Sequence, residues 1–155
     1  KQGMDAFIPE IERTWENYRK IAHPSRIRKV ALRTINRIFI PLVTDKNVDL
    51  DAYFEAGPKL PEVQTRQLAF TKFLNQHQVT DAGSGLFANM VLATQEPKDG
   101  KLPILLDIDA YDPRVREALN WEELASTINA LRVLKNDLFE KMVTEQCLKL
   151  FSNPA

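Results

Sequence analysis

Two segments in which apolar residues alternate with polar or charged ones constrain the fold of this chain more than any other feature. They are residues 30–40 (VALRTINRIFI) and residues 104–111 (ILLDIDAY). Because successive side chains of a strand point to opposite faces of a sheet, each segment is predicted to be a strand with one apolar face. Arg33 and Arg37 share one parity, as do Asp107 and Asp109. We therefore expect a sheet whose other face carries charges.

Turn-forming clusters divide the middle of the chain into further short strands. Residues 81–85 (DAGSG) and 96–100 (EPKDG) are rich in Gly, Asp and Pro, which are typical of tight turns. Strand, turn, strand, turn and strand at this spacing favour an antiparallel meander. The predicted strands cover residues 28–43, 67–76, 85–95 and 102–111.

Helical spacing of apolar residues marks both ends of the chain. Residues 4–22 repeat apolar positions every three or four residues, which predicts an amphipathic helix. A second, longer helix is expected to begin after Asn120, which forms a capping box with Glu123, and its apolar stripe continues to Phe151. Asp49 is a candidate N-cap for a short helix before the first turn of the meander.

The predicted order is helix, strand, short helix, three strands and long helix. Consecutive antiparallel strands flanked by helices favour an α+β fold, here an antiparallel sheet of about four strands with the long C-terminal helix across one face. A length of 155 residues fits one domain, residues 1–155. The sheet face away from the helix is then expected to carry Arg33, Arg37, Asn89, Asp107, Asp109 and Tyr111.

Three segments resemble a known family. Residues 23–40 (HPSRIRKVALRTINRIFI), 106–111 (LDIDAY) and 135–144 (KNDLFEKMVT) look like motifs from the C-terminal half of a sporadically distributed bacterial family of uncharacterised proteins. The chain departs from the family pattern at Thr34, where an aromatic residue is usual. The resemblance implies an upstream half and no established activity. The order of elements is similar to helix-grip and TATA-binding-protein-like half-domains, which bears on the fold alone.

The composition limits the classes of partner and compartment. The formal net charge is zero, so no overall field favours nucleic acid, and no nucleic-acid partner is expected. No apolar run approaches the roughly 20 residues of a membrane-spanning helix, and no signal peptide is visible, so a cytoplasmic protein without a membrane partner is expected. The single cysteine, Cys147, forms no internal disulfide and is interpreted as a packing residue rather than a nucleophile.

The charged strands supply the candidate binding residues. Arg33 and Arg37 are suited to hold a phosphate or carboxylate ligand, but cross-strand ion pairs with Asp107 and Asp109 are the preferred interpretation. Asn36 interrupts the apolar face of its strand and is expected to hydrogen-bond a backbone group. The candidate ligand-binding residues are Arg33, Asn36, Arg37, Asn89, Asp107, Asp109 and Tyr111.

Catalytic and metal chemistry find less support. Asp107 and Asp109, with Asp112 nearby, could supply oxygen ligands to Mg²⁺ or Ca²⁺, but no histidine or further carboxylate completes the shell. We therefore predict no metal, no cofactor and no catalytic residue. The expected function is a non-catalytic binding or interaction module for an unidentified ligand or protein, as a homodimer or against an upstream half. The alternatives are a metal-dependent phosphate-ester or nucleotide-processing enzyme and a helix-grip pocket for a small ligand.

Overall fold

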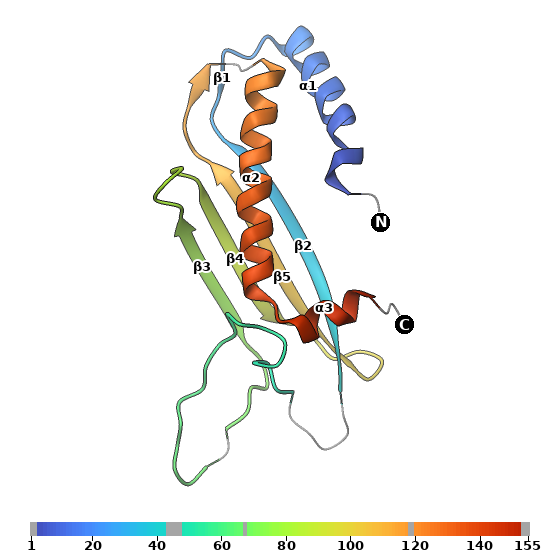
Figure 1. Ribbon diagram of the computed structural model, residues 1–155, viewed down its shortest axis with the longest axis vertical. Helices are drawn as coiled ribbons and strands as arrows, with labels where there is room; N and C mark the ends of the chain where they lie inside the picture. Colours follow the sequence, from blue (N-terminus) through green and yellow to red (C-terminus); the bar gives the residue numbers. More distant parts are fainter. Residues whose placement is uncertain (1–2, 43–47, 67, 118–119, 153–155) are drawn as a thin grey trace.

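A four-stranded antiparallel sheet with helices on one side forms the body of the molecule (Figure 1). The structure is a computed structural model that describes residues 3–42, 48–66, 68–117 and 120–152. The strand order is β2–β5–β4–β3, and β1 pairs with β6 in a separate two-stranded ribbon. The elements are η1 (Met4–Ala6), α1 (Ile8–Ala22), β1 (Arg26–Ile27), β2 (Val30–Pro41), β3 (Leu74–Thr80), β4 (Phe87–Thr94), β5 (Lys101–Asp112), β6 (Arg116–Glu117), α2 (Trp121–Met142) and α3 (Glu145–Ser152).

The long helix α2 lies across one face of the sheet, where it contacts β5 and β2 (Figure 1). This arrangement confirms the predicted α+β fold. The helix begins where the sequence predicts, because the Asn120 side chain accepts a hydrogen bond of 2.9 Å from the backbone N–H of Glu123. None of the helices in the described ranges combines the length and apolar character that crossing a bilayer requires.

The core lies between α2 and the sheet. Ile104, Leu106 and Ile108 of β5 point toward the helix and are fully buried, and so is Leu131 of α2. Every second residue of the central strand is therefore removed from water, which is the alternation that the sequence predicts.

Helix α1 packs on α2 rather than on the sheet. Ile8, Ile11 and Trp15 form a cluster with Leu124 and Ile128 at the N-terminal half of α2. The predicted apolar stripe of residues 4–22 is only partly used, since its C-terminal end is exposed. Helix formation itself agrees with the sequence, with Pro9 in the first turn, where its missing N–H costs little.

The meander turns form as predicted. Asp81 accepts hydrogen bonds from the backbone N–H groups of Gly83 and Ser84, at 3.2 and 3.1 Å, and closes the β3–β4 turn. Gly85 and Gly100 adopt φ values of 71° and 68°, which favour glycine. Local turn chemistry thus accounts for the positions of these two turns.

The strand expected at residues 67–76 is displaced to β3, so that prediction is wrong for its first half. Residue 67 lies outside the described residues, and residues 68–73 form no strand. Phe70 and Phe73 instead pack edge-to-face, with ring centroids 5.7 Å apart, and Phe73 N–H donates to Thr94 Oγ1 at 3.0 Å. The apolar side chains of this segment pack at the end of the sheet. Their alternation in the sequence is the same as that of a strand, so the pattern could not tell the two structures apart.

The short helix predicted after Asp49 is a turn. The backbone N–H groups of Tyr53 and Phe54 both donate to the carbonyl of Leu50, at 3.0 and 2.9 Å, and the chain then leaves this conformation. Phe54 forms a β-bridge with Val143 and is almost completely buried. A tertiary contact thus replaces the further helical turns that the sequence suggests.

The predicted long helix is also shorter than its apolar stripe. Val143 adopts an extended conformation, with φ −113° and ψ 147°, and ends α2. Thr144 then begins α3, since its hydroxyl accepts from the backbone N–H of Cys147 at 3.2 Å and donates to the carbonyl of Ala52 at 2.6 Å. The end of the stripe, including Phe151, therefore belongs to a second helix.

Candidate functional site

The face of the sheet turned away from α2, here called the open face, carries most of the candidate binding residues. The antiparallel register places Arg33 opposite Asp109, and Asp109 opposite Asn89 on the next strand. Tyr111 and Phe87 are the neighbouring pair in this register. Six of the seven candidate residues therefore lie together on the open face, and Asn36 does not.

Arg33 and Asp107 form a bidentate ion pair on the open face. Arg33 Nε donates to Asp107 Oδ1 at 2.9 Å, and Arg33 Nη2 donates to Asp107 Oδ2 at 2.5 Å. The Asp107 side chain is nearly buried, whereas the Arg33 side chain is more than half exposed. This bond raises the pKa of Arg33 above its ordinary value. The cross-strand ion pair that the sequence favours is thus present for these two residues.

Asp109 is held by a lysine that the sequence did not single out as its partner. Lys29 Nζ donates to Asp109 Oδ2 at 3.3 Å and lies 4.1 Å from the centroid of the Tyr111 ring, a cation–π geometry. Tyr111 stacks on Phe87, with ring centroids 5.6 Å apart, and its hydroxyl accepts from Gln78 Nε2 at 2.6 Å. At this end of the open face, the polar and aromatic side chains therefore interact with one another.

Arg37 is an unneutralised cation on the open face. Its side chain is exposed, and within the described ranges it makes no hydrogen bond or ion pair. The predicted pairing of Arg37 with an aspartate is therefore wrong. Leu105 lies opposite Arg37. The diagonal neighbour, Asp107, is already bonded to Arg33. Asn89 is half-buried beside Asp109 and likewise has no hydrogen-bond partner for its side chain among the residues that the structure describes.

Asn36 lies on the helix side of the sheet, which separates it from the other candidate residues. Its neighbour in the register is Leu106, whose side chain is in the core. The side chain of Asn36 is half-buried, and no hydrogen bond joins it to any part of the chain that the structure describes. Asn36 is therefore not part of the open face, and the expected bond to a backbone group is absent from the described residues.

Asp112 does not join Asp107 and Asp109 in an oxygen cluster, because it points to the opposite side of the sheet. Only 1 % of the residue is exposed. Its carboxylate accepts two hydrogen bonds of 2.8 Å from Arg114 and a further one from Arg116, which also bonds Thr127 of α2 at 3.2 Å. The Arg114 bonds hold the pKa of Asp112 below its usual value, although burial alone would raise it.

An apolar patch on the open face is the feature that the sequence interpretation missed. It consists of five side chains from all four strands: Ile35 and Phe39 of β2, Leu105 of β5, Val91 of β4 and Leu74 of β3. Ile35 is 58 % and Leu74 70 % exposed. The signal was present, since residues 35 and 39 share the parity of the two β2 arginines, but the charges are the more conspicuous part of that pattern.

The metal-site arrangement considered for this face does not assemble. Asp107 and Asp109 are bonded to different cations, Arg33 and Lys29, and the third carboxylate of β5, Asp112, lies on the other side of the sheet. No group of three His, Cys, Asp or Glu side chains suited to a metal ion occurs in the described part of the chain. The arrangement is that of charge pairs on a surface.

The space between helix and sheet is largely filled, but two cavities lie at its margins. One, of about 380 Å³, lies between β2, α2 and the N-terminal residues, and Leu32, Thr34 and Lys135 are among its lining residues. It is the nearest counterpart of the predicted helix-grip pocket. A larger cavity, of about 560 Å³, lies at the loop end of the sheet and was not predicted from the sequence.

Comparisons with known proteins assign no family to the chain. No protein-family model matches it, and neither the search of curated proteins nor that of solved structures finds a match. The family resemblance of residues 23–40 accordingly stays a prediction. The open face, with its paired charges, its unneutralised Arg37 and its apolar patch, is the surface from which a function is best argued.

Proposed function

We propose that the protein is a non-catalytic interaction module that binds a segment of another protein on the open face of its sheet. The apolar patch, which consists of Ile35, Phe39, Leu74, Val91 and Leu105, is the observation that carries this proposal. Singly exposed apolar residues are normal on protein surfaces, but a contiguous group with a polar rim is typical of a protein-binding site.

The charges around the patch favour a particular kind of partner. The carboxylates of Asp107 and Asp109 are already paired with cations of the chain. Arg37 lies beside Leu105 and has no ion pair with any described residue, so the charge offered to a partner next to the patch is positive. The partner segment we expect combines apolar side chains with a carboxylate that reaches Arg37.

A peptide selection tests this proposal even though the partner is unidentified. The chain is immobilised through a C-terminal tag and presented with a random 12-residue phage-displayed library, with the Ile35→Glu variant as the counter-selection target. Peptides rich in apolar and acidic residues are expected to be enriched and to bind Ile35→Glu at least about tenfold more weakly. Arg37→Glu is expected to shift the enriched peptides from acidic to basic ones.

Val133→Glu is the matched control. Val133 is 52 % exposed, close to the value for Ile35, but it lies on α2 and not on the open face. Its substitution should leave peptide binding unchanged. Enriched peptides that bind wild type and Ile35→Glu equally would refute the proposal. Light scattering coupled to size exclusion identifies a second copy as the partner if a dimer forms and is lost in Ile35→Glu.

The other two functions considered from the sequence have weaker support. A metal-dependent enzyme needs the Asp107 and Asp109 carboxylates free to bind an ion, and each instead contacts a basic side chain. A helix-grip pocket needs space under the middle of α2, where the fully buried Leu106 of β5 belongs to the packed core. The cavity of about 380 Å³ between β2 and α2 lies at the margin of this core. Both alternatives remain untested predictions.

A further inference from the structure

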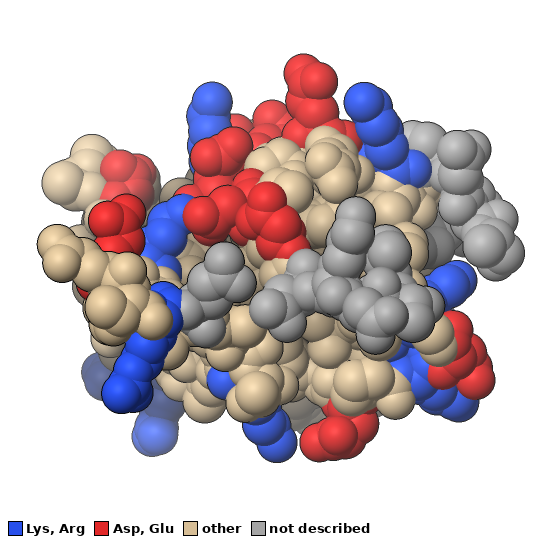
Figure 2. All heavy atoms as spheres, turned by 90° about the horizontal axis from the view of Figure 1, so that it is seen from below, with Lys and Arg blue, Asp and Glu red and all other residues tan. Residues whose placement is uncertain are grey.

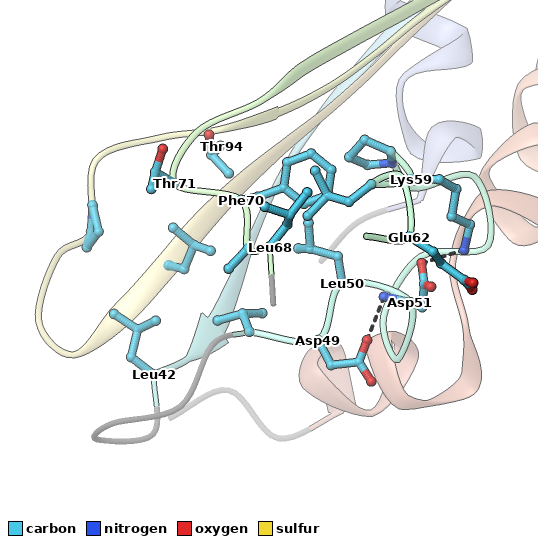
Figure 3. Close-up of a pocket in the computed structure, with 16 residues that line it drawn as sticks. Leu42, Asp49, Leu50, Asp51, Lys59, Glu62, Leu68, Phe70, Thr71 and Thr94 are labelled. Carbon is cyan, nitrogen blue, oxygen red and sulfur yellow. Dashed lines mark hydrogen bonds and ion pairs between the residues drawn. The ribbon is translucent and has the colours of Figure 1, made fainter. Parts of the chain in front are cut away.

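A cavity lies at the loop end of the sheet (Figure 3). Residues 48–51, 58–60, 62 and 68–71 form most of its wall, and residues at or next to the ends of β2, β4 and β5 contribute the rest. Its volume of about 560 Å³ is within the range of sites for small molecules. The cavity shares no lining residue with the apolar patch.

The interior of this cavity is apolar. Leu50, Leu68 and Phe70 approach one another at its centre, and Leu42 lies on the far side (Figure 3). Leu50 is part of the buried core, which fixes the floor, whereas Leu68 is 47 % exposed. Covering this exposed leucine with an apolar chain removes apolar surface from water, which is favourable.

The charged side chains of the cavity lie together on one side of it. Asp49, Asp51 and Glu62 contribute three carboxylates, and Lys59 contributes the one cation among the described lining residues (Figure 3). Lys59 Nζ is 2.6 Å from Asp51 Oδ1, which leaves the other two acids without a cation in this part of the described wall. Seen from this end of the molecule, acidic side chains form a cluster beside uncharged residues (Figure 2).

We propose that this cavity binds a small molecule that has an apolar chain and a cationic amine head. The apolar interior accommodates the chain, and the excess of carboxylates at one side attracts a positive charge and repels an anionic head. A bare metal ion fits less well, because no group of three ligating side chains occurs among the described residues. This proposal is independent of the function proposed for the open face.

Titration with simple amphiphiles tests the proposal. n-Octylamine, 1-octanol and octanoate share one chain and differ in head charge. Methyl chemical shifts of Val48, Leu50 and Leu68 are expected to saturate with octylamine, whose Kd should be at least about fivefold lower than that of octanoate. From butylamine to octylamine, each added methylene is expected to lower the Kd about threefold.

Two sets of variants separate the chain from the head. Leu68→Ser is expected to weaken octylamine binding about fivefold. Its control is Leu148→Ser on α3, where the leucine is 40 % exposed. The double variant Asp49→Asn/Glu62→Gln should reduce the preference for octylamine over octanoate to about twofold or less.

The charge variant has its own control. Asp49→Asn keeps the side-chain oxygen that accepts from the Asp51 N–H at 3.1 Å, so the local turn is preserved. The double variant Glu117→Gln/Glu122→Gln removes two exposed acids that do not line the cavity and should leave the preference unchanged. Equal affinity for octylamine and octanoate, no saturable shifts, or shifts centred on the methyl groups of Ile35 and Leu105 would overturn the proposal.

Discussion

Arg33 bonds Asp107 although the register places it directly opposite Asp109. The long arginine side chain reaches the diagonal neighbour two residues along the partner strand, a distance that cross-strand contacts commonly span. Asp109 instead accepts a hydrogen bond from Lys29, which lies just before β2. The two aspartates look like one acidic site in the sequence, but in the structure each is paired with a different cation.

Divalent metal ions are accordingly expected to leave the stability of the protein unchanged. A ligand that binds only the folded state raises the Tm, and Mg²⁺, Mn²⁺ or Ca²⁺ at millimolar concentration should shift it by less than about 1 °C. Thermal unfolding before and after chelation provides the measurement. A metal-dependent rise that disappears in Asp109→Asn would restore the metal-dependent alternative.

Asp112→Asn is expected to destabilise the fold more than the same change at Asp109. The Asp112 carboxylate is buried and bonded to two arginines, one of which also bonds Thr127 of α2. Loss of these charge-assisted bonds should lower the free energy of unfolding by on the order of 2 kcal/mol. Urea unfolding of both variants measures the difference, and equal effects of the two substitutions would contradict this assignment.

The stability of the protein is expected to fall in acid, and Asp112 should contribute to the loss. Hydrogen bonds from Arg114 lower the pKa of this carboxyl in the folded state. Its contribution to stability is therefore complete above the unfolded-state pKa of about 4 and is lost as the pH falls through the folded-state value. Urea unfolding between pH 6 and pH 2 should show a shallower decline for Asp112→Asn, and identical slopes would contradict the prediction.

Cys147 is expected to resist thiol reagents in the native protein. The residue is fully buried, and burial raises its pKa to about 11. Since the thiolate is the reactive form, labelling by a chromogenic disulfide at pH 8 should be at least about a hundredfold slower than in urea-unfolded protein. Similar labelling rates in the two states would show that α3 does not protect the thiol.

Leu131→Ala is expected to cost about 3 kcal/mol of stability, because it opens a cavity between α2 and the sheet. Leu131 is fully buried and packs against Leu86 and Ala110. Val133→Ala, two residues along the same helix, removes an exposed side chain and should change the free energy of unfolding by less than about 0.5 kcal/mol. Comparable costs for the two variants, measured by urea unfolding, would refute this packing arrangement.

The fold could be predicted from the sequence to the extent that local signals specify it. Asn120 begins α2 because its side chain satisfies a free N–H of the first helical turn, a requirement that a few residues define. Gly85 and Gly100 likewise favour the turns before β4 and β5 through their own backbone conformations. Residues 68–73 show where such prediction fails. An alternating apolar pattern occurs both in strands and in irregular segments that pack at the end of a sheet, and these residues are of the second kind.

The sequence predicted which residues of the candidate site share one face of the sheet, but not which of them contact one another. Strand parity places Arg33, Arg37, Asp107 and Asp109 on one side of the sheet. Which acid each cation reaches depends on the register between segments some 70 residues apart, and parity carries no information about register.

Sequence patterns correctly predicted the succession of the four sheet strands, the helices α1 and α2 and the two faces of the central strands, because side-chain periodicity and capping chemistry are local properties. It was the tertiary structure that established the ion pair of Arg33 with Asp107, the position of Arg37 opposite a leucine and the inward turn of Asp112 to two arginines. It also revealed the apolar patch and the cavity at the loop end. These features bring together residues from distant strands and loops, and their distances are set by packing rather than by any single segment of the chain.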